Sequence, residues 1–163
     1  MKSFQLPFAL CLWFSMSFFH SWAQSISAWP HNEVVVIDAK KIEHVMKSMF
    51  DKPEAPLLVT PITVHGRYAV AGWIQGDHGG RAFLKKENNQ WSIRLCGGEG
   101  LKQADALVMA GMRRNEALQL AAKIAVDEQR VSSEDLKKLS LFQGIIEVSN
   151  EKNDVHQVHP RHH

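Results

Sequence analysis

Apolar residues recur at helical spacing between residues 38 and 50. The positions are Ile42, Val45, Met46, Met49 and Phe50, which stand at i, i+3, i+4, i+7 and i+8. Residues with this spacing lie on one face of an α-helix, so the pattern predicts an amphipathic helix packed on the rest of the protein. Asp38 is suited to cap its N-terminus. Pro53 ends it, because the residue before a proline disfavours helical backbone angles.

The stretch ahead of this helix, residues 24–37, is a mixed leading segment. It contains Trp29-Pro30 and the apolar run Val34-Val35-Val36-Ile37. β-branched residues are enriched in strands. The run therefore predicts either an edge strand or an extended segment that packs on the domain.

Between residues 57 and 96 the pattern changes from helical spacing to short extended segments. Four of them, rich in β-branched and aromatic residues, span 57–64, 68–74, 81–86 and 91–96. Turn-forming residues separate them at 65–66, 76–80 and 88–89. In the last segment Trp91, Ile93 and Leu95 alternate with more polar residues, which makes one face apolar. The sequence predicts a four-stranded antiparallel meander.

Helical spacing returns after Gly97-Gly98. We expect a short helix over 101–111, a second helix capped by Asn115, and a third behind the capping pair Ser132 and Asp135. Residues 144–148 are suited to a closing strand. From residue 149 the chain becomes polar, which predicts a disordered tail over 149–163. An N-terminal helix, a four-stranded meander and two to three C-terminal helices make a single α+β domain over residues 38–148.

Methionines recur along the predicted helices. Met46 and Met49 lie on the apolar stripe of the first helix, and Met109 and Met112 lie near the end of another. Thioethers are soft copper(I) ligands, but methionine at such positions commonly fills gaps in a core. We expect core packing for all four.

Residues 1–23 have the features of a signal peptide. Met1-Lys2 supplies a positive start, an apolar run follows up to Trp22, and Ser21-Trp22-Ala23 fits the small-x-small cleavage pattern. A membrane anchor is the competing interpretation, because the run is close to spanning length. Polar residues follow at 24–27 without a basic stop-transfer cluster, which favours cleavage. We expect export to the periplasm and no membrane attachment afterwards.

Cleavage would change what the cysteine count means. Removing 23 of the 163 residues leaves 140 and takes Cys11 away, so that Cys96 is the remaining thiol and no internal disulfide can form. The fold must then rest on a hydrophobic core, for which a chain with 45% hydrophobic residues is adequate. The formal net charge of +2 is too small to predict a nucleic-acid partner.

The C-terminal tail is rich in histidine. His156, His159, His162 and His163 place four imidazoles within eight residues. Imidazole binds copper(II), nickel(II) and zinc(II), and the intrinsic order of affinities puts copper(II) above zinc(II). The tail therefore predicts a labile copper site. The competing interpretation is a solvated end of biased composition with incidental metal affinity.

Two further places are candidates for chemistry. Cys96 stands where a strand meets two glycines, and its thiolate would favour copper(I). A lone cysteine there is more commonly a packing residue, and a catalytic thiol would need a lowered pKa. The glycine-rich turn at 75–81 lacks the strand-to-helix context of a phosphate loop. We expect a hairpin whose Asp77, His78 and Arg81 form an exposed edge that binds a partner.

Several blocks of the sequence have a distinctive order. They are residues 50–57, 70–76, 79–84 and the run Trp91-Ser92-Ile93-Arg94-Leu95-Cys96-Gly97-Gly98. These blocks resemble the bacterial family called copper uptake system-associated protein, and the likeness extends from about residue 38 to residue 148. The resemblance implies an exported protein that works in copper acquisition alongside copper chaperones, without an established catalytic activity. Cys96 and Arg81 look like part of the family pattern, whereas His78 and the tail look particular to this chain.

Together these features predict a periplasmic accessory protein of copper uptake that binds or hands over copper without catalysis. A copper chaperone or a membrane copper importer is the partner that this implies. The alternative is an adaptor that docks such a partner through its meander and has no metal site of its own. A thiol enzyme built on Cys96 is a third hypothesis.

Overall fold

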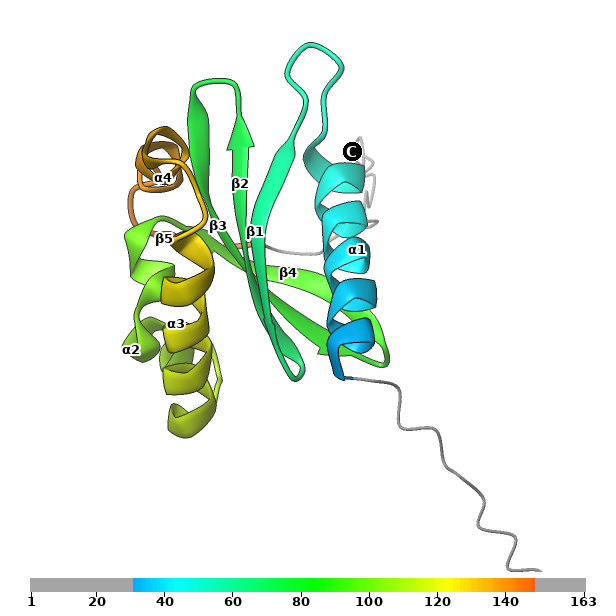
Figure 1. Ribbon diagram of the computed structural model, residues 1–163, viewed down its shortest axis with the longest axis vertical. Coiled ribbons are helices and arrows are strands. Elements are labelled where there is room, and N and C mark those ends of the chain that lie inside the picture. Colours follow the sequence, from blue (N-terminus) through cyan, green and yellow to red (C-terminus); the bar gives the residue numbers. More distant parts are fainter. Residues whose placement is uncertain (1–30, 149–163) are drawn as a thin grey trace, which may run out of the picture.

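The computed structural model describes residues 31–148, which form an N-terminal helix, a five-stranded antiparallel sheet and a C-terminal group of helices (Figure 1). The sheet lies between helix α1 (His31–Phe50) on one face and the C-terminal helices on the other. The predicted α+β class is confirmed.

The sheet is a meander whose strands follow the order of the chain. They are β1 (Leu58–His65), β2 (Tyr68–Gln75), β3 (His78–Glu87), β4 (Gln90–Gly97) and β5 (Ile145–Glu147), each antiparallel to its neighbours. The first four strands confirm the predicted meander. The predicted closing strand is also present, since β5 pairs with the last residues of β4. Asn88 and Asn89 both have positive φ, as a two-residue loop between β3 and β4 requires.

Helix α1 begins earlier than the sequence predicted. It starts at His31, so the run from Val34 to Ile37 is helical, and the prediction of a strand or an extended segment there is wrong. β-branched residues lower helix propensity only slightly, and Val35 gains a contact with the core that offsets this cost. Asp38 lies within the helix and does not cap it. The end of the helix at Phe50 is as predicted.

Two apolar clusters join the helices to the sheet. On the α1 face, Ile42 and Met46 belong to a buried cluster with Leu84 of β3. On the opposite face, Leu120 of α3 (Arg114–Glu128) belongs to a cluster with Phe83, whose ring stacks on Tyr68 with 5.9 Å between centroids. Burying a large apolar side chain stabilises a fold by about 1.5–3 kcal/mol. These clusters are therefore the main source of stability.

The C-terminal helices differ from prediction in their bounds. The helix predicted over 101–111 is divided into a short 3-10 helix, η1 (Glu99–Lys102), and α2 (Ala104–Met109). Helix α3 begins at Arg114, and Arg113 takes the N-cap position. The predicted cap, Asn115, therefore lies inside the helix. Ser132 caps α4 (Ser133–Leu139) as predicted, because its Oγ accepts a hydrogen bond from the amide of Asp135 at 3.1 Å. Among the helices that the structure describes, none has the length and apolar content needed to span a membrane.

Candidate functional site

The predicted site residues do not share one described surface. The tail histidines His156, His159, His162 and His163 lie outside the described residues, as do the predicted leader and its cleavage site. Asp77 and His78 are exposed at the turn between β2 and β3, where Gln75 pairs with His78. Arg81 and Cys96 are buried on different elements.

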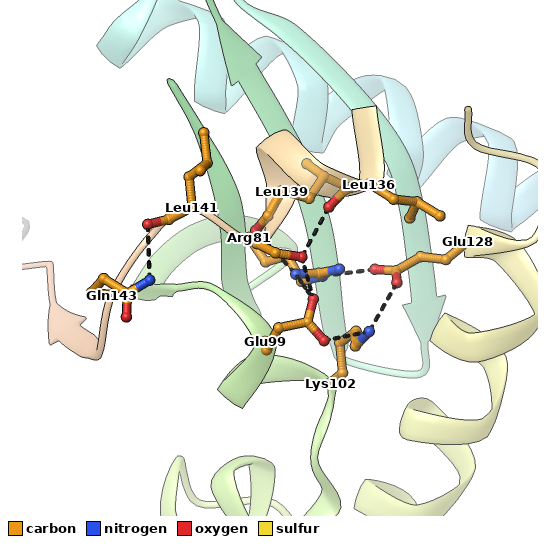
Figure 2. A network of polar contacts seen from close by, with 9 residues as sticks. Arg81, Glu99, Lys102, Glu128, Leu136, Leu139, Leu141 and Gln143 are labelled. Carbon is orange, nitrogen blue, oxygen red and sulfur yellow. Dashed lines mark hydrogen bonds and ion pairs between the residues drawn. The ribbon is translucent and has the colours of Figure 1, made fainter. Parts of the chain in front are cut away.

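Arg81 lies in a buried ion pair, with only 1% of its surface exposed. Its Nε donates a hydrogen bond to Glu128 Oε1 at 2.7 Å (Figure 2). Its Nη1 donates to the carbonyl oxygen of Leu139 at 3.1 Å and lies 3.1 Å from Glu99 Oε1. Lys102 Nζ adds a second positive charge, 2.6 Å from Glu99 Oε2 and 3.6 Å from Glu128 Oε2. The prediction that Arg81 belongs to an exposed binding edge is wrong. It joins β3 to η1, α3 and α4.

The glycines near Arg81 leave room for the chain segment that covers it. A Cβ on Gly79 would lie 2.7 Å from the carbonyl oxygen of Lys138, and a Cβ on Gly98 would overlap the carbonyl oxygen of Phe142. Only glycine permits backbone segments to approach so closely. The glycine-rich sequence thus brings the end of α4 against β3, which is how the Leu139 carbonyl reaches Arg81.

The network shifts the pKa of Glu99. Burial alone would raise the pKa of its carboxyl. Hydrogen bonds from Lys102 and Ser140, with the charges of Arg81 and Lys102, outweigh burial and hold the pKa below its ordinary value of 4.5. The carboxylate stays charged at neutral pH, where it accepts a 2.6 Å hydrogen bond from Ser140 Oγ.

Cys96 lies in the apolar cluster on the α1 face of the sheet, 9% exposed. It lines a cavity of about 130 Å3, whose other lining residues are Met46, Phe50, Leu57, Trp73 and Gln75. Burial raises the pKa of the Cys96 thiol to about 11, because a thiolate there loses its hydration. A nucleophilic cysteine requires the opposite shift. This environment disfavours a catalytic thiolate and suits a packing residue.

The environment of Cys96 predicts slow alkylation. In the folded chain beginning at Gln24, iodoacetamide should modify Cys96 at pH 8 at least about 100-fold more slowly than in the urea-unfolded chain, because both the thiolate fraction and the access of reagent fall. Mass spectrometry at timed intervals measures both rates, and free cysteine in the same urea concentrations corrects for the solvent. Equal rates in the folded and unfolded chains would contradict the buried, protonated thiol.

A groove of about 640 Å3 lies between α2 and the paired strands β4 and β5. Its lining residues are Arg94, Leu95, Ala106, Met109, Ala110, Ile145, Glu147 and Val148. Six of the eight lining residues are apolar, Arg94 and Glu147 add one positive and one negative side chain, and the exposed surface of the wall is about as polar as it is apolar. Such a groove can accommodate a segment of chain or a small molecule.

Within residues 31–148 no three His, Cys, Asp or Glu side chains are grouped so that they could hold a metal ion. Comparisons with models of protein families, with curated proteins and with solved structures each found no match for this chain.

Sequence reasoning missed the partners of Arg81 and the groove. Glu99, Lys102 and Glu128 occur in segments that carry ordinary helical patterns, and no spacing marks them as partners of a strand residue. The groove depends on β5 meeting β4 beside α2. The only local signal was the pair of glycines before Glu99, which indicated a close approach without saying of what.

Proposed function

We propose that this protein is a periplasmic accessory protein of copper uptake that binds or hands over copper without catalysis. The observation that carries the proposal is the density of imidazoles at the C-terminus, four in eight residues. The resemblance of residues 38–148 to the copper uptake system-associated proteins implies the same role, although the comparisons identified no family. The tail supplies the ligands, and the folded domain supplies the body that a copper chaperone or membrane importer would contact.

The tail is a better copper site than Cys96. Neutral imidazoles are available at the pH of the periplasm, because their ordinary pKa is about 6.5. A metal at Cys96 would have to displace a proton from a buried thiol whose pKa is raised to about 11. The ion held by the tail should also be labile, because the polar composition of residues 149–163 predicts a disordered segment, and ordering it on binding would cost part of the binding free energy. Lability suits a protein that passes its ion on.

The proposal is tested by removing the tail imidazoles. In the chain beginning at Gln24, replacing His156, His159, His162 and His163 with glutamine should weaken copper(II) binding at least about 100-fold, or about 2.8 kcal/mol. Truncation after Asn150 should do the same. Isothermal titration against a competing ligand, such as glycine, measures the change.

A matched control replaces the three histidines outside the tail whose side chains the structure describes. They are His44, His65 and His78. Their replacement with glutamine should leave the copper affinity within about twofold of the unmodified chain, a difference of about 0.4 kcal/mol. Copper affinity that survives removal of the tail imidazoles would eliminate this site.

That negative result would favour the adaptor. One observation supports this second function: Asp77 and His78 stand exposed on a hairpin held by a rigid meander, a common setting for recognition residues. The adaptor would contact its partner through this hairpin and would not bind copper when isolated. The copper-binding accessory protein would bind copper through its tail.

A further inference from the structure

Two grooves flank the turn between β3 and β4. The first, of about 480 Å3, lies between α1 and the start of β4. Its lining residues include Lys40, Lys41, Val45 and Trp91. The second, of about 580 Å3, lies between the β3–β4 turn and the β1–β2 turn, and Arg67 and Lys86 line it. Asn89 lines both grooves, so they belong to one surface, at the end of the sheet where α1 begins (Figure 1).

Three hydrogen bonds fix the shape of this surface. The carboxylate of Asp38 on α1 accepts hydrogen bonds from Trp91 Nε1 at 3.0 Å and from Lys86 Nζ at 2.6 Å. The amide of Lys86 donates to the carbonyl oxygen of Arg67 at 2.8 Å. These contacts join α1, the β3–β4 hairpin and the β1–β2 turn to one another. The surface is therefore formed before a partner arrives, which lowers the entropic cost of binding.

Positive charge is concentrated here. The lining of the two grooves contains four cations and one carboxylate, a net charge of +3, whereas the whole chain has a formal net charge of +2. They are Lys40, Lys41, Arg67, Lys86 and Glu87. The ion-pair partners of the last two are Asp38 and Lys85, which add one charge of each sign and leave the sum unchanged. Both lysines of α1 and Arg67 have no carboxylate within 4.0 Å among the described residues.

Apolar side chains extend this surface along α1. Val34 and Ile37 are 41% and 45% exposed. Together with Lys41 and Val45 they are spaced three or four residues apart, so they lie on one side of the helix. Val45 reaches the first groove beside Trp91, and the wall of that groove is mostly apolar, because the stems of the lysines are aliphatic. The surface thus combines an apolar strip with exposed cations along its edge.

We propose that this basic surface binds an acidic segment of a partner protein. Carboxylates of the segment would face Lys40, Lys41 and Arg67, and an apolar side chain between them would enter the groove between α1 and β4. Complementary charge defines the sign of the partner. The inference does not rest on copper binding by the tail. It also places the partner at the end of the sheet opposite Asp77 and His78.

The shape of the surface favours a peptide over other polyanions. Single-stranded nucleic acid is bound by stacking on exposed aromatic rings, but Trp91 is 5% exposed and its indole N–H is already bonded to Asp38. A lipid surface would contact the protruding side of α1 and leave the recessed wall of the groove empty. A peptide can place a carboxylate and an apolar side chain within a few ångströms of each other, which is the arrangement that this lining matches.

Peptide binding tests the proposal. The probe is a fluorescein-labelled peptide with the sequence Glu-Glu-Phe-Glu-Glu, titrated by fluorescence anisotropy into the chain beginning at Gln24. Exposed charges act mainly through association rate and salt dependence, so raising the salt from about 25 mM to about 250 mM should weaken binding about tenfold. The double variant K40E/K41E should weaken binding at least about tenfold at the lower salt. Amide shifts in the NMR spectrum should fall on residues 34–45 and 89–91.

A second variant tests the apolar strip. Ile37→Ser changes an exposed side chain, so the fold should be preserved. It should weaken binding of the phenylalanine peptide about threefold and leave binding of Glu-Glu-Ala-Glu-Glu unchanged, because the alanine peptide has no large apolar side chain to lose contact. A loss that is the same for both peptides would contradict the role of the strip.

The matched control changes the same charge elsewhere. Lys52 and Lys137 are exposed and lie outside both grooves, and K52E/K137E should bind the probe within about twofold of the unmodified chain. Equal binding by K40E/K41E and K52E/K137E, amide shifts on other residues, or no binding at the lower salt would each overturn the inference. So would phosphatidylglycerol vesicles or a short single-stranded DNA that displaced the peptide at a lower concentration than the unlabelled peptide does. Copper(II) affinity should be the same in K40E/K41E as in the unmodified chain, so failure here leaves the tail site standing.

Discussion

Replacing Arg81 with methionine is expected to lower the free energy of unfolding by about 3–5 kcal/mol. The substitution leaves Glu128, whose side chain is 8% exposed, as a buried carboxylate without its closest partner. Lys102 lies 3.6 Å away and compensates only in part. The Leu139 carbonyl also loses its hydrogen bond. Urea denaturation followed by tryptophan fluorescence measures the loss.

The double variant separates the ion pair from packing. Replacing Glu128 with leucine in R81M removes the unpaired charge, so the double variant should recover to within about 1 kcal/mol of the unmodified chain. Nη2 of Arg81 is buried without a hydrogen-bond partner among the described residues. The native ion pair therefore carries an unpaid desolvation cost that the double variant does not have, which favours this recovery.

An exposed pair is the control for Arg81. Arg113 contacts Glu116 at 2.9 Å, but 80% of the Arg113 side chain is exposed. Arg113→Met should therefore leave the urea midpoint close to that of the unmodified chain, because water screens the pair. If R81M and R113M were equally stable, the buried network would not hold β3 to the C-terminal helices.

R81M should also change how stability depends on acid. The pKa of Glu99 is lowered in the folded chain, so its contribution is complete above the ordinary value of 4.5 and is lost as the pH falls through the lowered value. Without Arg81 one cause of the lowering is removed. The loss of stability on acidification should then be smaller in R81M than in the unmodified chain.

Asp38→Ala is expected to cost about 2–3 kcal/mol. Asp38 is 4% exposed, and its carboxylate accepts hydrogen bonds from Trp91 Nε1 at 3.0 Å and from Lys86 Nζ at 2.6 Å. Alanine would leave the buried indole N–H unpaired. The ammonium of Lys86 would lose its partner, although it is partly exposed and can reach water. Urea denaturation again measures the change.

Two variants define the cause of the Asp38 effect. Asp38→Asn keeps an acceptor for Trp91 and loses the charge opposite Lys86, so it should cost about 1 kcal/mol. Glu43→Ala on the same helix removes an exposed pair with Lys47 and should leave the urea midpoint close to that of the unmodified chain. A loss in D38A no larger than in E43A would show that α1 is held by apolar contacts alone.

The candidate sites differ in how far the sequence could predict them. The histidine cluster can be recognised in the amino-acid sequence, so a copper site in the tail could be proposed without a structure. All four methionines were expected to fill the core, which is correct for Met46 and Met112 and wrong for Met49 and Met109, whose side chains are exposed. Asp38 resembles a helix cap in the sequence and is a buried acceptor in the structure. Residue type limits what a side chain can do, and its neighbours decide what it does.

By itself the sequence determined the meander, the end of α1 before Pro53 and the Ser132 cap of α4. These features follow from backbone preferences and hydrogen bonds between residues close in the chain. Only the tertiary structure decided the partners of Arg81, the environment of Cys96 and the groove beside Met109. Arg81 and Glu128 are 47 residues apart, and Asp38 and Trp91 are 53 apart. Such contacts depend on which helices pack on each face of the sheet. The local sequence pattern does not determine that packing.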